Sequence, residues 1–211
     1  MIAAKMVASM KSVRTRALLS LGIVLGLTSV STLAFWTDSA QLTTGSIQTA
    51  KLDLKLDGQD NVPTSTKLAI QSMIPGESVA ATIGVQRVAN TIAFTYSGSA
   101  QVTAANELTE ALRFKVFAGS ANAQTVASGT GIRTQTCGGT QIFGGADGAK
   151  LTAAATSLFS SRAALATPLA LPANDLTDNL CVQAILPTST DNGAQNKTAS
   201  VSLTFNAVQL S

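Results

Sequence analysis

The side chains that could carry out catalysis are few in this 211-residue chain, which has no histidine, two cysteines and 11 acidic residues. Without histidine, the H-E-x-x-H arrangement that binds zinc and places a general base is absent. A serine nucleophile would need lysine as its base, and Ser161 and Lys150 show no spacing that pairs them. Acidic pairs for glycoside hydrolysis could be chosen from Glu77, Glu107, Glu110 and Asp147, but any protein with 11 acids permits such pairs. We therefore expect a protein that is not an enzyme.

Binding motifs for metals, phosphates and cofactors are equally weak. No D-x-D-x-D-G calcium loop occurs, although Asp175 and Asp178 could bind calcium weakly. A solvated loop is the simpler interpretation of these two residues. The pairs Gly138-Gly139 and Gly144-Gly145 lack the Lys-Ser/Thr that completes a phosphate loop, so they indicate turns. We predict no cofactor and no metal site.

The two cysteines, Cys137 and Cys181, fit a protein that meets an oxidising environment. One disulfide is the simplest interpretation, and two buried free thiols are the alternative. A redox role has little support because the chain contains no C-x-x-C motif.

The N-terminal residues have the charge order of a secretory signal. Residues 1–16 contain Lys5, Lys11, Arg14 and Arg16 and no acid, and an apolar run follows over 17–34. Thr32-Leu33-Ala34 places small residues where a signal peptidase reads, so we predict a signal peptide at 1–34 that is cleaved between Ala34 and Phe35. Asp38-Ser39-Ala40 is a second candidate cleavage site. The 18-residue run is also close to the length of a membrane span, so a retained anchor is the alternative, and membrane contact is expected only through an uncleaved signal segment.

Removing this leader changes the charge of the protein. The leader holds four of the 14 basic residues and none of the 11 acidic ones, so residues 35–211 carry a net charge of about −1. The remaining lysines and arginines are scattered singly. Nucleic-acid binding requires clustered basic side chains, so we predict no nucleic-acid partner.

Two-residue periodicity dominates the rest of the chain and predicts an all-β fold. Branched aliphatic residues with few aromatics are typical of a secreted β-sandwich of modest core volume. Ile74-Pro75-Gly76-Glu77 favours a type II turn. Predicted strands occupy 51–57, 79–88, 92–96, 113–118, 180–186 and 198–210, with a further one over 125–127.

Helical signals are short. Asn106 followed by acidic residues predicts a helix up to Leu112. The alanine-rich stretch 151–165 also predicts a helix, inside a glycine-rich and alanine-rich region, 136–174, whose role the sequence leaves open.

Several of these segments together resemble the TasA/camelysin family, and most closely its actinobacterial branch of alternate signal-mediated exported proteins. The resemblance rests on Phe35-Trp36, on Thr44-Gly45-Ser46 followed by Leu52-Asp53-Leu54, on the 74–77 turn and on the terminal segment 201–207. It implies a jelly-roll-like antiparallel β-sandwich over 51–211 and export through a dedicated signal peptidase. The metallopeptidase activity attached to the camelysin name conflicts with the absence of histidine.

For the best-known members, the family also implies fibres of the biofilm matrix in which the N-terminal segment of one subunit adds as a strand to the next. Segment 35–50 is the candidate donor, and its assembly residues would be Phe35, Trp36, Leu42 and Ile47. Head-to-tail addition does not close, so it produces filaments. The same segment could instead fold back as the first edge strand of its own domain.

We therefore expect a secreted, non-enzymatic structural protein of the cell surface or matrix that self-associates. A monomeric secreted adhesin or ligand-binding module, with recognition loops between Cys137 and Cys181, is the alternative from a different class. A divergent peptidase is a third.

Overall fold

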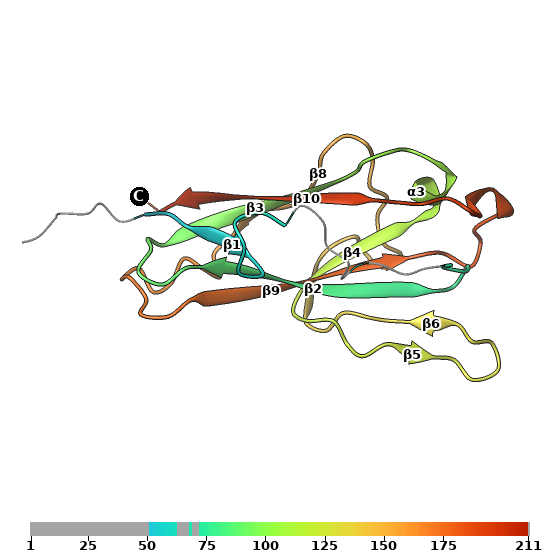
Figure 1. Cartoon of the computed structure of the whole chain (residues 1–211), viewed down its shortest axis with the longest axis horizontal. Helices are drawn as coiled ribbons and strands as arrows, with labels where there is room; N and C mark the ends of the chain where they lie inside the picture. Colours follow the sequence, from blue (N-terminus) through green and yellow to red (C-terminus); the bar gives the residue numbers. More distant parts are fainter. Residues whose placement is uncertain (1–50, 63–67, 69–71, 211) are drawn as a thin grey trace, which may run out of the picture. The chain divides into compact units, whose positions relative to one another are not determined.

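The computed structural model describes residues 51–62, 68 and 72–210, which form an antiparallel β-sandwich within the compact unit Thr49–Ser211 (Figure 1). The strands are β1 (Leu54–Leu56), β2 (Ser78–Arg87), β3 (Phe94–Val102), β4 (Arg113–Ala118), β5 (Thr125–Val126), β6 (Arg133–Thr134), β7 (Thr140–Phe143), β8 (Thr156–Arg162), β9 (Leu176–Ile185) and β10 (Val201–Gln209). One short helix, α3 (Glu107–Ala111), and one 3₁₀ turn, η1 (Asn192–Ala194), complete the described elements. The predicted all-β sandwich is confirmed.

The strands form two main sheets and a separate hairpin. The larger sheet has the order β1-β2-β9-β4-β7, the smaller one has the order β10-β3-β8, and β5 pairs with β6. Every strand pair is antiparallel. In Figure 1 the β5–β6 hairpin lies beside β2.

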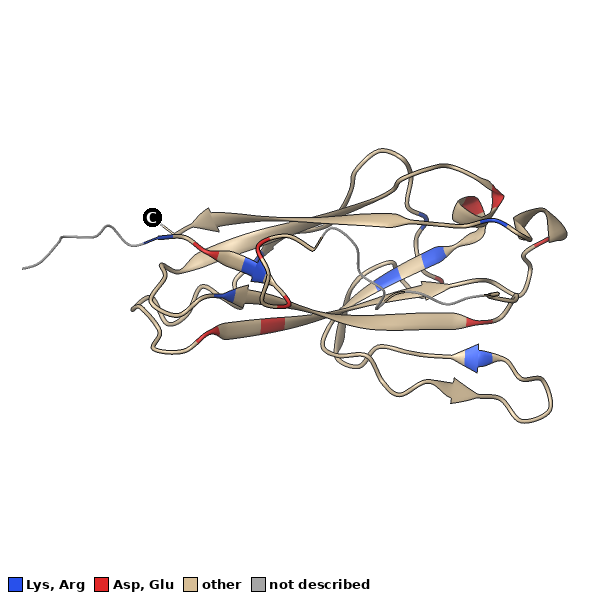
Figure 2. Cartoon of the chain, in the orientation of Figure 1, with Lys and Arg blue, Asp and Glu red and all other residues tan. Residues whose placement is uncertain are grey.

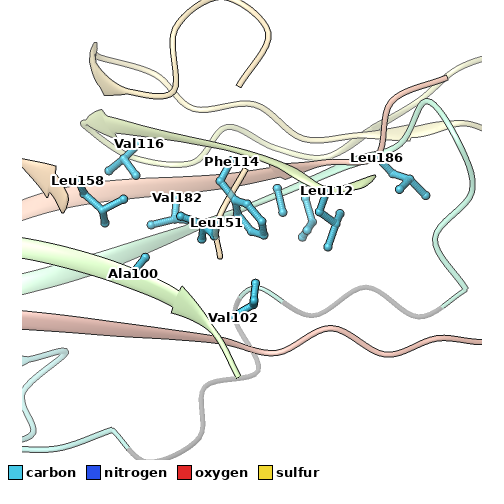
Figure 3. Packing of buried hydrophobic residues seen from close by; sticks show 11 residues of the cluster. Ala100, Val102, Leu112, Phe114, Val116, Leu151, Leu158, Val182 and Leu186 are labelled. Atoms are coloured by element: carbon cyan, nitrogen blue, oxygen red, sulfur yellow. The ribbon is translucent and has the colours of Figure 1, made fainter. Parts of the chain in front are cut away.

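The core lies between the two sheets, where alternating side chains meet (Figure 3). Along β3, buried and half-buried residues alternate without interruption, as expected for a strand with one face on the core. The first core cluster contains Val79, Ala100, Val102, Leu112, Phe114, Val116, Leu151, Leu158, Val182, Ala184 and Leu186. The second core cluster contains Val85, Phe94, Tyr96, Leu165 and Leu180.

Local chemistry accounts for the predicted connections. Asn106 caps α3 by accepting from the Thr109 backbone N–H at 3.0 Å, and the Thr109 hydroxyl accepts in return from the Asn106 N–H at 2.8 Å. At the 74–77 turn, Gly76 has a φ of +96°, a conformation that glycine adopts without steric cost. The Glu77 N–H donates to the Ile74 carbonyl at 3.1 Å and closes this turn.

One predicted element is wrong. The stretch 151–165, predicted as a helix, contains strand β8 at Thr156–Arg162. Alanine favours a helix locally, but β8 pairs with β3 and buries Leu158 in the first core cluster. Tertiary pairing therefore overrides local propensity here.

The disulfide between Cys137 and Cys181 is confirmed. Cys181 is fully buried on β9, whereas Cys137 lies in the segment that returns from the β5–β6 hairpin. The bond therefore ties this hairpin to the centre of the larger sheet. A disulfide fits a protein that functions in an oxidising environment.

Candidate assembly edge

The outer edge of β10 is the feature of this sandwich best suited to binding an extended chain. Among the described residues, β3 is the only strand that pairs with β10. The Thr103 N–H donates to the Ser200 carbonyl at 3.0 Å, and the Leu210 N–H donates to the Ala93 carbonyl at 3.3 Å. Even-numbered residues of β10 therefore bond to β3, because antiparallel hydrogen bonding alternates along a strand. The N–H and C=O groups of the odd-numbered residues point outward.

The length and composition of β10 do not protect that edge from pairing. It has nine residues in one unbroken register with β3, and it contains neither a charged residue nor a proline. In Figure 2 the ribbon of β10 has no blue or red segment, the colours of basic and acidic residues. Edge strands are normally protected from pairing by charges, prolines, bulges or a short length. None of these four devices is present on β10.

The inward side chains of β10 hold it in place on the sandwich. Leu203 packs on the first core cluster, and Phe205 and Ala207 pack on the second. The Phe205 ring lies 6.3 Å from the Tyr96 ring and 6.4 Å from the Phe159 ring, measured between centroids. Such aromatic contacts add to the energy of burial. These contacts anchor β10 on the core of the sandwich.

In the larger sheet, β1 pairs with β2 only from Val85 to Arg87, and the preceding stretch of β2 is covered by other groups. Gln135 lies alongside it: its backbone N–H donates to the Ser78 carbonyl at 3.1 Å, and its side-chain oxygen accepts from the Ala80 N–H at 3.2 Å. Farther along, the Asp57 carboxylate accepts from the Gly84 N–H at 3.0 Å. Side chains and a non-strand segment therefore occupy main-chain groups that another strand could otherwise bind.

The segment that covers β2 is itself fixed. We call residues 119–137, which include the β5–β6 hairpin, the arm. Its Arg133 binds the buried Glu77 carboxylate through Nε to Oε1 at 2.6 Å and through Nη2 to Oε2 at 2.7 Å. This fork, together with the backbone N–H groups of Ile74 and Arg133, lowers the pKa of Glu77 to about 2. The disulfide and this ion pair hold the arm at two points.

The other edges are short or irregular. β1 has three residues. Lys51 and Asp53 precede it, with Lys51 Nζ 2.9 Å from Asp53 Oδ2, and Asp57 follows it. β7 has four residues, and its Gln141 side-chain amide donates to the Phe143 and Gly145 carbonyls. β8 shifts register twice against β3. Shortness, charge and bulges are recognised protections of sheet edges.

The interpretation of Asp178 as a solvated loop residue is wrong, because Asp178 lies on β9 and belongs to a structural ion pair. Its two oxygens accept from Arg162 Nε at 2.9 Å and from Arg162 Nη2 at 3.0 Å, and the Tyr96 hydroxyl also donates to it. Burial is the main cause that raises the pKa of Tyr96, followed by its hydrogen bond to Asp178. Because these three residues come from β3, β8 and β9, the cluster joins the two sheets.

Two of the remaining candidate residues, Asp175 and Lys150, have partners elsewhere in the fold, and two others, Glu107 and Glu110, line one surface depression. Asp175 accepts from the Ala89 N–H at 2.7 Å, and Lys150 pairs with Glu110 at 3.2 Å, so Lys150 has a carboxylate partner rather than a serine. Glu107, Glu110 and Asp191 line a surface depression with a volume of about 590 Å³. In the described part of the chain, no group of three or more histidine, cysteine or acidic side chains could hold a metal ion.

The predicted assembly residues Phe35, Trp36, Leu42 and Ile47 lie outside the described residues, as do the signal peptide and the cleavage site between Ala34 and Phe35. Within the described ranges, no helix is long and apolar enough to cross a membrane. The donor segment, 35–50, thus stays a prediction.

Comparison with known proteins assigns no family: no protein-family model and no curated protein matches the chain. The resemblance to the TasA/camelysin family stays a prediction.

The sequence predicted a donor segment but did not single out a candidate acceptor. Residues 198–210 were predicted to be a strand, and the uncharged, proline-free sequence Val201–Gln209 was a readable signal of an unprotected edge. Whether a strand lies at an edge depends on its neighbours in the sheet, which the alternation of side chains does not reveal.

Proposed function

We propose that this chain is a secreted, non-enzymatic structural protein of the cell surface or extracellular matrix, which self-associates into fibres by strand addition. The acceptor is the outer edge of β10, and the donor is segment 35–50 of another copy, released by signal peptidase cleavage after Ala34. The observation that carries the proposal is the uninterrupted nine-residue edge of β10, which within the described ranges has no covering segment and no charge, proline or bulge.

The chemistry of this edge favours an extended peptide over a small ligand. The outward N–H and C=O groups of Val201, Leu203, Phe205, Ala207 and Gln209 repeat at the spacing of a strand. A peptide that adds to such an edge gains main-chain hydrogen bonds, and its alternate side chains reach the sheet face. Apolar Leu42 and Ile47 of the donor would then supply the contacts that select this segment.

Strand addition between copies would also explain why β10 carries no residues that protect its outer edge from pairing. An unprotected edge in a secreted protein risks uncontrolled aggregation unless a partner covers it. A donor carried by every copy gives a regular head-to-tail assembly, because the donor and the acceptor lie on different parts of each subunit.

The direct test is Ala207→Pro. The Ala207 N–H points away from β3, so proline removes one outward donor and leaves the β3–β10 hydrogen bonds in place. We expect secreted Ala207→Pro to stay monomeric by negative-stain microscopy and sedimentation, with the thermal unfolding midpoint close to that of the wild type. Ala207→Val, which keeps the N–H, is the matched control and should assemble.

Trp36→Ala tests the donor in the same assay and should weaken assembly without unfolding the domain. A wild-type protein that starts at Phe35 and stays monomeric at every concentration would overturn the proposal. It would favour the monomeric adhesin, whose recognition loops would lie between Cys137 and Cys181.

A further inference from the structure

A buried arginine at the end of β2 holds the loop that follows β8. Arg87 is fully buried and donates to the Thr91 carbonyl through Nε at 3.1 Å and Nη2 at 2.7 Å. Its Nη1 donates to the Leu165 and Pro168 carbonyls at 3.3 and 2.7 Å, and its Nη2 also donates to the Ala170 carbonyl at 3.1 Å. The guanidinium fork thus fixes three points of one loop.

This loop displays two leucines. We call residues 163–173 the leucine loop; it contains no charged residue. Leu169 is 73% exposed and Leu171 is 51% exposed, on either side of the held Ala170. Single exposed apolar residues are ordinary. Two leucines on a loop that a buried cation holds in one conformation form a preorganised contact, which loses little conformational entropy when it binds.

The leucine loop lies at the end of the sandwich where the preceding chain enters the domain. The Asn90 N–H donates to the Pro172 carbonyl at 2.8 Å, and the Ile92 N–H donates to the Lys51 carbonyl at 3.1 Å. The loop and the first described residue, Lys51, are therefore both bonded to the same short connection between β2 and β3.

The length of the donor limits how far the neighbouring copy can be. Sixteen residues, 35–50, precede Lys51 after the predicted cleavage. Covering the nine residues of β10 leaves about seven for the link, which span at most about 25 Å when fully extended. The neighbour that receives the donor must therefore lie close to the end of the sandwich that carries the leucine loop.

We propose that the leucine loop is a second contact of the subunit junction and that Leu169 and Leu171 pack against the neighbouring copy of this chain. The inference rests on the proposed function, because the short donor brings that copy to this end. Strand addition alone would let the two subunits rotate about the link between the donor strand and Lys51. The contact made by the leucine loop would fix the angle between the subunits and strengthen the junction.

The test compares the critical concentration for assembly of the secreted wild-type protein with that of Leu169→Ser/Leu171→Ser. We expect the double variant to need at least a tenfold higher concentration and to keep its unfolding midpoint, because both side chains are exposed. Val126→Ser, at a valine that is 62% exposed on β5, is the matched control and should assemble as the wild type does. A photo-crosslinking residue at position 169 should join two copies in the assembled state only.

The outcomes separate the two proposals. If the wild type assembles and the double variant has the same critical concentration, the leucine loop is not a junction contact, and strand addition stands. If the crosslinker at position 169 yields no dimer from assembled protein, the inference is overturned in the same way. If the wild type never assembles, the proposed function fails, and this inference fails with it.

Discussion

The stretch of β2 that β1 does not reach and the outer edge of β10 each lack a partner strand on one side among the described residues, and the protein treats them in opposite ways. Along β2, Gln135 and Asp57 bond to backbone N–H groups, and the arm is held over the edge by a disulfide and by the Glu77–Arg133 pair. Along β10, nine residues in regular register have no cover among the described residues. The contrast shows that the described part of the chain covers this stretch of β2 and leaves the outer edge of β10 uncovered. We infer that the open edge is functional.

Removing the disulfide should have the largest effect on stability. Cys137→Ser/Cys181→Ser opens a link across 44 residues and should lower the free energy of unfolding by roughly 3 to 4 kcal/mol in the chain-entropy model. If the arm protects β2, the Ala80 amide should also exchange faster in the variant. Chemical denaturation and hydrogen exchange measure the two effects. Unchanged exchange at Ala80 would show that the arm covers this edge without the disulfide.

Glu77 should make the cover of β2 sensitive to acid. The folded state lowers the Glu77 pKa from 4.5 to about 2, so its contribution is fully present above pH 4.5 and is lost as the pH falls towards 2. We expect about 2 to 3 kcal/mol less stability at pH 2 than at pH 7 from this group. Denaturant titrations across this range measure the change.

Glu77→Gln is the control for this pH dependence. It should lose most of this stability at pH 7 and show a flatter dependence on pH. A variant whose stability follows the wild-type pH curve would show that other carboxylates are responsible.

Gln135→Ala tests the cover of β2 more locally. The substitution leaves the Ala80 N–H without its acceptor, and we expect a loss of about 1 kcal/mol. Exchange should quicken at Ala80 and stay slow at Val79 and Ala81, because those amides face β9. Gln141→Ala, which removes a side-chain amide from the edge of β7, serves as the matched control. Equal effects of both variants on Ala80 would contradict the assignment.

Val208→Lys should have the smallest effect on stability and a clear effect on assembly. Val208 is 63% exposed on the outer face of β10, so the free energy of unfolding should change by less than about 0.5 kcal/mol. A lysine gives β10 one of the protections found on other edge strands, and we expect assembly to slow severalfold in light-scattering assays. Undiminished assembly would favour another acceptor edge.

Sequence patterns predicted the strands well where one face of a strand is buried. The alternation in 198–210 and the cap at Asn106 depend only on residues that are close in sequence. The strand and the helix start could therefore be predicted. The stretch 151–165 failed because alanine content indicates a helix, whereas Leu158 and the pairing with β3 determine a strand. The disulfide was predictable from the presence of two cysteines in a chain that is expected to be exported.

Of the two parts of the candidate site, only the donor could be predicted from the sequence. The donor could be proposed from the cleavage site and the apolar residues that follow it. The acceptor could not, because an edge is defined by which strands do not pair, and that depends on the order of strands in the sheet. The hydrogen bonds of Arg87 to the leucine loop could not be predicted either. Their acceptors are main-chain carbonyl oxygens, which every residue type has.

The most direct test of the central claim is residue-resolved hydrogen exchange along β10 in monomeric and assembled protein. In the monomer, we expect slow exchange at Thr204 and Asn206, which bond to β3, and fast exchange at Leu203, Phe205 and Ala207. On assembly, those three outward amides should become slow as well. Fast exchange at these three amides in the assembled protein, or slow exchange already in the monomer, would contradict strand addition between copies at this edge.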